Sequence, residues 1–209
     1  MSFAPPSGAG EPTTRLRILE AARRLFHEQG YHATAIATIL REAGVHSGSL
    51  YHLFPSKEAL LVGVLEHYLA LLRPAVMDPA EALASEPLER VFALLSLYRE
   101  GLGASSFKLG CPIGNLALEV GDELPEARAL IDRNFANWTA AVESWLVAAG
   151  DALPSGLDRT RLARFVLTVM EGSVMQARAA GSLQPFDDSV EQLRSYFDCL
   201  QSSTPSQRP

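Results

Sequence analysis

Two short segments with a helical spacing of apolar residues meet at Gly44, and this junction constrains the fold more than any other feature of the sequence. Ile36, Ile39 and Leu40 show the helical spacing before the glycine, and Ser47–Phe54 follows it as far as a proline. Because glycine ends helices and proline stops them, we expect two separate helices joined by a tight turn. The pattern predicts a helix-turn-helix, in which the first helix supports the second.

The helical spacing recurs along the rest of the chain, and strand-like alternation of useful length is missing from the sequence. A first helix around residues 18–26 is expected to end at Gly30, and a fourth is expected to start after Ser56 and to stop before Pro74. The sequence therefore predicts an all-α protein. Further helices are expected at about Leu88–Glu100, Ile113–Val120, Glu126–Ala149, Arg159–Ala180 and Ser189–Leu200.

Composition narrows the class of protein. No apolar run approaches the roughly 18 residues that span a bilayer, and residues 1–12 lack the basic start of a secretory signal, so we expect a cytoplasmic protein. Cys111 and Cys199 form neither a disulfide framework nor metal-ligand spacing, and both are expected to be buried thiols. The sequence has no phosphate loop, G-x-S-x-G or H-E-x-x-H motif. We therefore expect no enzymatic activity, metal or cofactor.

Charge is distributed unevenly along the chain. The total is −6, but the first 60 residues hold six Lys or Arg against five Asp or Glu, a net of +1, and the remainder holds −7. All five histidines lie at or before His67. This asymmetry is mild, and charge alone does not identify a nucleic-acid binder. DNA binding is therefore predicted from the helix-turn-helix pattern and not from charge.

The second short helix carries small and polar residues. A recognition helix places its outer face in the major groove, where small side chains let the backbone approach phosphates and base edges. Ser47 and Ser49 offer hydroxyls, and Tyr51 and His52 can reach phosphates or thymine methyl groups. Lys57 stands at the start of the next helix, where it can bind a phosphate beside unpaired N–H groups. The alternative is that the small residues only cap an ordinary short helix.

The run from Thr14 to Leu60 resembles the DNA-binding domain of the TetR family of bacterial transcriptional regulators. It contains I-L-E-A-A-R-R-L-F-H-E-Q-G-Y, then A-T, then A-G-V-H-S-G-S-L-Y-H-L-F-P-S-K-E-A-L, and it stays in register over 47 residues. The resemblance implies a three-helix DNA-binding domain at 13–60 and a larger helical domain at 61–201 that dimerises and binds a small inducer. The polar tails at 1–12 and 202–209 are predicted to be disordered.

The resemblance also implies which residues contact DNA. Thr34 opens the second helix and is the expected phosphate-binding hydroxyl, with Ala35 beside it. Three positions depart from the family pattern: His46 replaces a serine or threonine cap, Leu40 a customary alanine, and Leu53 a histidine or tyrosine. None is expected to break the fold. The implied DNA-binding set is Thr34, Ala35, Ser47, Gly48, Ser49, Tyr51, His52 and Lys57.

A ligand site is implied in the second domain. The segment G-C-P-I-G-N-L-A-L-E-V, residues 110–120, is similar to one in a subset of the family, some members of which sense electrophiles or oxidants through a cysteine there. For Cys111 a packed thiol is the favoured alternative, because Lys108 is its only nearby cation in sequence. The apolar lining predicts a small apolar or aromatic inducer. Its expected residues are Tyr98, Phe107, Cys111, Asn115, Phe135, Trp138 and Met170.

The last two long helices form the dimer interface in the family. Here they carry an apolar stripe with small residues, which permits close helix contact across a two-fold axis. The alternative is that these side chains face the core of their own subunit. The expected interface residues are Leu162, Phe165, Val166, Val169, Ser173, Leu193, Tyr196 and Phe197.

These features predict a ligand-responsive repressor. A homodimer would bind a pseudo-palindromic operator in double-stranded DNA and be released by a small molecule that stabilises a different dimer geometry. The competing class is a helical adaptor or interaction protein of the same fold that has lost operator binding, as the acidic balance and the altered His46 and Leu53 suggest.

Overall fold

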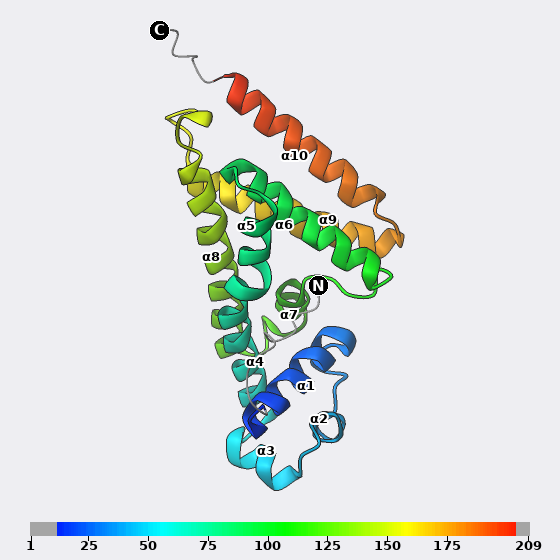
Figure 1. Ribbon diagram of the computed structural model, residues 1–209. Coiled ribbons are helices and arrows are strands. Elements are labelled where there is room, and N and C mark those ends of the chain that lie inside the picture. Colours follow the sequence, from blue (N-terminus) through cyan, green and yellow to red (C-terminus); the bar gives the residue numbers. More distant parts are fainter. Residues whose placement is uncertain (1–11, 204–209) are drawn as a thin grey trace. The chain divides into compact units, whose positions relative to one another are not determined.

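A computed structural model of the chain describes residues 12–203, and every regular element in that range is helical (Figure 1). The predicted all-α class is confirmed. The predicted tails lie outside the described residues except for Pro12, Ser202 and Ser203, and Ser202 is the last residue of a helix. The elements are α1 Thr14–Gln29, α2 Ile36–Ala43, α3 Ser47–Leu53, α4 Lys57–Leu72, a π-helical turn η1 Arg73–Met77, α5 Asp78–Leu83, α6 Pro87–Ala104, α7 Pro112–Val120, α8 Pro125–Ala148, a 3-10 turn η2 Gly150–Ala152, α9 Arg159–Ala180 and α10 Gln184–Ser202.

By compactness the chain divides into two units. Among the described residues, the N-terminal unit contains Pro12–Leu72 and Leu109–Phe135, and the C-terminal unit contains Arg73–Lys108 and Ala136–Ser203. Helix α7 and the first part of α8 therefore belong with α1 to α4, although they follow α6 in sequence. The functional boundary expected after residue 60 stays a prediction. By packing, α4 and α7 belong to the same unit as the helices that precede residue 60.

Helix α1 is the central element of the N-terminal unit and packs against α2, α3, α4 and α7. It begins where the Thr13 hydroxyl accepts a hydrogen bond from the backbone N–H of Leu16 at 3.3 Å. Its inward stripe, which includes Ile18, Ala22 and Leu25, is buried, as the spacing predicted. The helical period in the sequence thus identifies the face that α1 turns toward the core.

Polar contacts also join the helices of this unit. The Glu20 carboxylate of α1 accepts a hydrogen bond from Arg23 at 2.7 Å and lies 2.6 Å from Nε2 of His67 on α4. Burial alone would raise the pKa of Glu20, but the bonds from His67 and Arg23 outweigh it and lower that pKa. The buried Asn134 amide of α8 donates to the Leu65 carbonyl of α4 at 3.2 Å. The unit is therefore fastened by paired polar groups as well as by apolar burial.

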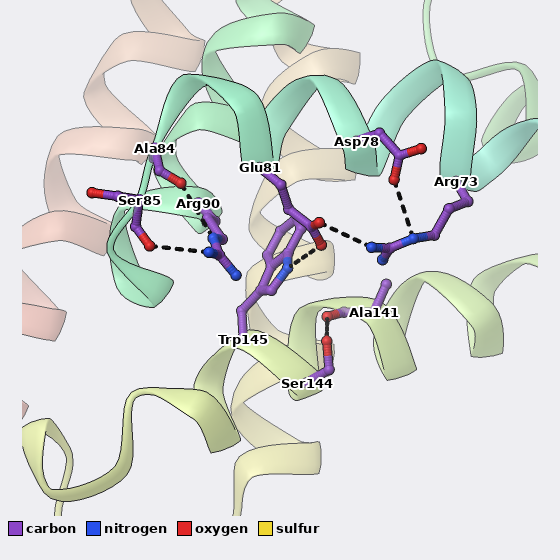
Figure 2. Close-up of polar contacts among 9 residues, drawn as sticks. All are labelled: Arg73, Asp78, Glu81, Ala84, Ser85, Arg90, Ala141, Ser144 and Trp145. Carbon is purple, nitrogen blue, oxygen red and sulfur yellow. Dashed lines mark hydrogen bonds and ion pairs between the residues drawn. The ribbon is translucent and has the colours of Figure 1, made fainter.

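In the C-terminal unit, a carboxylate fastens α5 to α8 (Figure 2). Trp145 Nε1 of α8 donates to Oε1 of Glu81 at 2.9 Å, and Arg73 contacts the other oxygen of Glu81 at 2.9 Å. The bond from Trp145, helped by Arg73, lowers the pKa of Glu81. The Trp145 side chain is among the largest that the protein buries completely, so its one polar atom needs this partner.

Helix α4 ends at Leu72, before Pro74 as predicted, but the chain does not leave the helical conformation there. Helical structure continues from α4 through the π-helical turn into α5, and the wider turn accommodates a residue that has no backbone N–H to donate. The resulting 27-residue run, Lys57–Leu83, has a mean hydropathy of 1.5 over its most apolar stretch, so by length and composition it could cross a membrane, contrary to the expectation from sequence. Because 56% of that stretch is buried inside the protein, the run has the character of a core helix.

Other differences from the predicted elements are small. Helix α10 begins at Gln184 instead of near residue 189, and Pro185 stands in its first turn, where a missing N–H costs nothing. Helix α6 extends to Ala104, beyond the expected end. Cys111 is buried as expected, but the expectation is wrong for Cys199, which lies on the exposed side of α10. The spacing of apolar residues predicts where these helices lie. Their exact ends depend on residues that are not part of the apolar stripe.

Candidate nucleic-acid interface

The turn between α2 and α3 is built around Gly44. Its backbone adopts φ +62°, the left-handed conformation that closes helices, and its N–H bonds the Leu40 and Arg41 carbonyls of α2. The next N–H, of Val45, also donates to the Leu40 carbonyl, at 3.1 Å. This turn confirms the helix-turn-helix predicted from the position of Gly44.

The inner face of α3 is anchored in the unit's core. Leu50 is fully buried, and Phe54, directly after the helix, is 4% exposed. The Arg15 guanidinium of α1 lies 5.2 Å from the centre of the Phe54 ring. Gly63 of α4 leaves room for that ring, because a Cβ at this position would lie 2.9 Å from Phe54 Cε1. These contacts hold α3 in one orientation.

The outer face of α3 is open to solvent. The residues predicted to read DNA on this helix are all exposed, and the Tyr51 side chain retains 52% of its accessible surface. Four of them are spaced i, i+1, i+4 and i+5, which places them on one face of a helix. The exposed set is Ser47, Gly48, Ser49, Tyr51 and His52. The structure therefore brings these five predicted residues together, and their contact with DNA stays a prediction.

The three departures from the family pattern leave both helices intact. His46 occupies the N-cap position of α3 but its side chain makes no capping hydrogen bond there. Leu40 and Leu53 are both half-buried. The absent cap means that α3 starts without the side-chain acceptor that usually stabilises a first turn.

Thr34 and Ala35 differ sharply in exposure. Thr34 is 1% exposed, and its hydroxyl donates to the Gly30 carbonyl at 2.6 Å and lies 3.3 Å from the Leu25 carbonyl. This hydroxyl is occupied inside the protein, so the geometry gives Thr34 a structural role in the turn after α1 and not the outward one expected from the sequence. Ala35 is exposed and is the N-cap residue of α2, directly before its unpaired N–H groups.

Lys57, the first residue of α4, turns toward the segment that joins α1 to α2. Its Nζ lies 4.4 Å from the centre of the Tyr31 ring and donates to the His32 carbonyl at 3.3 Å. Burial lowers the pKa of Lys57, and the nearby Glu119 carboxylate partly opposes that shift. An ammonium group has three N–H donors, so a phosphate at this position could bind Lys57 beside the His32 carbonyl.

Glu119 of α7 is a residue of this region that sequence reasoning missed. Its carboxylate accepts hydrogen bonds from the backbone N–H of Tyr31 at 2.8 Å and of His32 at 2.7 Å. No periodicity or motif relates residues so far apart in the sequence. The resemblance to the family's DNA-binding domain ends at Leu60, so it gives no indication of a contact from α7.

A surface groove in the C-terminal unit runs between α9 and α10, with a volume of about 430 Å³. Phe165 and Tyr196 lie on it, 46% and 43% exposed, with their rings edge to face at 5.8 Å between centres. Of the residues predicted for a dimer interface, Phe165, Val169, Ser173, Leu193 and Tyr196 line this groove. Leu162, Val166 and Phe197 are instead buried in the protein's own core, as the alternative reading allowed.

The predicted ligand residues are distributed over both units. In the C-terminal unit Tyr98, Trp138 and Met170 are buried, with the Tyr98 and Trp138 rings edge to face at 5.5 Å, and Phe107 is half-buried at a backbone φ of +62°. In the N-terminal unit Cys111 is the N-cap of α7, where its Sγ accepts from the Gly114 N–H at 3.5 Å. Asn115 and Phe135 are half-buried in the same unit. A ligand role for these seven residues stays a prediction.

Two family models match this chain: that of the bacterial regulatory proteins of the tetR family over residues 18–64, and that of the C-terminal domain of LmrA/YxaF-like transcriptional regulators over residues 87–192. MT0206, an uncharacterized HTH-type transcriptional regulator of Mycobacterium tuberculosis, is 33% identical over 86% of this chain and 92% of its own. The HTH-type transcriptional repressor DhaR of Mycobacterium sp. (strain GP1) is 25% identical over 91% of this chain and 93% of its own. The crystal structure of regulatory protein TetR from Rhodobacter sphaeroides has a TM-score of 0.75 and 26% identity, covering 84% of this chain and 94% of that one.

Proposed function

Because this chain belongs to the TetR family of bacterial transcriptional regulators, we propose that it is a ligand-responsive repressor that binds a pseudo-palindromic operator as a homodimer. The observation that carries the proposal is the α3 helix, whose exposed polar face is held outward by the buried Leu50 and by the Gly44 turn. A helix held in this way can enter the major groove as a rigid element. Family members are DNA-binding regulators and not enzymes.

Dimerisation through α9 and α10 is supported by the groove between them. Phe165 and Tyr196 keep nearly half of their surface in solvent, which is unfavourable for two neighbouring aromatic rings. A second copy placed on this face by a two-fold axis would cover both rings. Such a dimer would present two α3 helices to half-sites about 34 Å apart, one turn of DNA.

Repression and release by a small molecule are the finer parts of the proposal. Support for repression comes from the relative DhaR, which is named as a transcriptional repressor. Support for an apolar or aromatic ligand comes from the aromatic and apolar character of Tyr98, Trp138 and Met170. Release requires that the ligand bind one dimer geometry more tightly than the DNA-binding one.

Operator binding is tested by fluorescence anisotropy at about 150 mM salt, near physiological ionic strength. The purified protein is titrated with the DNA found immediately upstream of its own gene and with a shuffled duplex of equal length. We expect binding to the native duplex to be at least about a thousandfold tighter. If both duplexes bind weakly and equally, selection from random duplexes decides between a distant operator and a lost DNA function.

Substitutions separate the repressor from an adaptor of the same fold. Tyr51→Ala removes a side chain that is exposed on α3 and lies outside the core, so a repressor should lose operator affinity while its unfolding temperature changes little. Lys57→Ala should in addition lower the salt slope by about one if the ammonium group binds a phosphate in the complex. An adaptor should bind no duplex specifically, with or without these changes.

A further inference from the structure

The segment between α1 and α2 is held by a carboxylate from a different part of the chain. Glu119 uses one oxygen for each of two consecutive backbone N–H groups, those of Tyr31 and His32. Because the acceptor is ionised and the distances are short, these are stronger than hydrogen bonds between neutral groups. Both N–H groups follow the last turn of α1, so no helix supplies them with an acceptor.

Gly30 is what allows the carboxylate to approach. Its backbone φ is +86°, a conformation that side chains rarely adopt. A Cβ at this position would lie 3.0 Å from Oε1 and 3.1 Å from Oε2 of Glu119. The glycine that the sequence identified as a helix end therefore also makes space for Glu119. Residue 30 and residue 119 form one contact, although all the elements from α2 to α6 separate them along the chain.

The same segment is also held by Lys57 and by a hydrogen bond within the segment itself. Lys57 of α4 donates to the His32 carbonyl and covers the Tyr31 ring, and the Thr34 hydroxyl binds the Gly30 carbonyl. Helix α2 begins directly after this segment, with Ala35 as the N-cap residue of the helix. A shift of the Tyr31–His32 peptide would thus move both the start of α2 and the ammonium group of Lys57. Those are two of the positions expected to face the DNA backbone.

We propose that Glu119 is a positioning residue for DNA binding: by holding the Tyr31 and His32 N–H groups, it makes α7 the support that keeps α2 and Lys57 in place for the operator. One further contact links the residues before α7 to α1: His27 Nε2 lies 2.8 Å from the Gly110 carbonyl. The proposal rests on the proposed function, since positioning has meaning only for a protein that binds an operator.

Glu119→Gln tests the proposal, because an amide has one acceptor oxygen and presents an NH₂ group where the second acceptor is needed. Glu123→Gln is the matched control: it removes the same charge from a residue beyond the end of α7, whose exposed carboxylate lies 3.4 Å from the exposed His32 ring, whereas the Tyr31 and His32 N–H groups donate to Glu119. Two quantities are measured for each: hydrogen exchange at the Tyr31 and His32 amides in the protein alone, and affinity for the native upstream duplex and its shuffled counterpart, well below the unfolding temperature.

With Glu119→Gln we expect amide exchange at both positions to rise at least about tenfold and operator affinity to fall about tenfold, or about 1.4 kcal/mol. The salt slope for the operator should fall toward that of Lys57→Ala, because a shift of this segment displaces the Lys57 ammonium group. Glu123→Gln should remain within about twofold of the wild type, below 0.5 kcal/mol. Glu119→Asp keeps the charge but is one methylene shorter, so it should also weaken operator binding, and it replaces Glu119→Gln if that variant does not fold.

Three results would overturn the proposal. Unchanged amide exchange would mean that the carboxylate does not hold the segment in solution. Faster exchange with unchanged operator affinity would reduce Glu119 to a purely structural role. Normal operator binding by Glu119→Asp would show that only the charge matters. Failure of the proposed function is recognised separately, because the wild-type protein itself would then fail to distinguish the two duplexes while the exchange measurement still reports on the Glu119 contact.

Discussion

Replacing Thr34 by valine asks whether its hydroxyl serves the fold or the DNA. Valine has nearly the same shape but no hydroxyl, so the change removes the contacts of that hydroxyl with the Gly30 carbonyl at 2.6 Å and the Leu25 carbonyl at 3.3 Å. The side chain is 1% exposed, so water does not replace the lost donor easily. A buried hydrogen bond contributes about 0.5–1.5 kcal/mol net, and leaving its acceptor unpaired raises the cost, so we expect a loss of about 1–2 kcal/mol in the free energy of unfolding.

Urea unfolding at a fixed protein concentration measures this loss, since stability of a dimer depends on concentration. Thr34→Ser keeps the hydroxyl and serves as the control, with a loss below about 1 kcal/mol from the missing methyl group. The slope of log affinity against log salt for the upstream duplex should be the same in both variants, because a side chain this deeply buried cannot reach a phosphate. Unchanged stability of Thr34→Val together with a slope lowered by about one would refute this reasoning and restore a phosphate contact.

Three other substitutions test the packing, a carboxylate and the dimer. Gly63→Ala should destabilise the protein by about 1 kcal/mol in urea unfolding, because its Cβ would press on Phe54 at 2.9 Å and helix propensity recovers only part of the cost. Trp145→Phe should cost about 1–2 kcal/mol at pH 7. Since the bond from Trp145 lowers the pKa of Glu81, that stabilisation is present above the ordinary value of 4.5 and is lost as the pH falls through the folded pKa, so the difference between the two proteins should narrow in acid. Phe165→Asp should convert dimers to monomers in sedimentation at micromolar concentration, whereas Leu118→Asp, at a leucine 81% exposed on α7, should not.

Much of the fold could be predicted from local patterns. The boundaries of α9 agree with the prediction, and α1 and α2 follow the spacing of their apolar residues up to Gly30 and Gly44. Proline was a weaker guide, because Pro74 lies inside a π-helical turn and Pro185 starts a helix. Whether a proline ends a helix depends on whether the surrounding packing accommodates its missing hydrogen bond, and that is not a property of the local sequence.

The exposed face of α3 was accessible to sequence reasoning for the same reason. The helical period places the small and polar residues around Tyr51 on a different face of the helix from the apolar Leu50. The sequence alone therefore determined which of them could face a partner. The dimer stripe was harder to interpret. Phe165 and Phe197 are both apolar residues at helical spacing, yet one lies on the groove and the other packs edge to face on Phe92 in the core. Only the packing of α9 on α10 distinguishes them.

The sequence by itself determined that this chain is a bundle of helices with a helix-turn-helix near its start, because helices depend on residues within a few positions of one another. The tertiary structure alone decided what the polar groups of that region do. Thr34 points inward, Lys57 turns toward Tyr31 and His32, and Glu119 arrives from α7 to bind the same segment. Hydrogen-bond partners are chosen by distance in space, and for these residues the folded chain brings together groups that no sequence period relates.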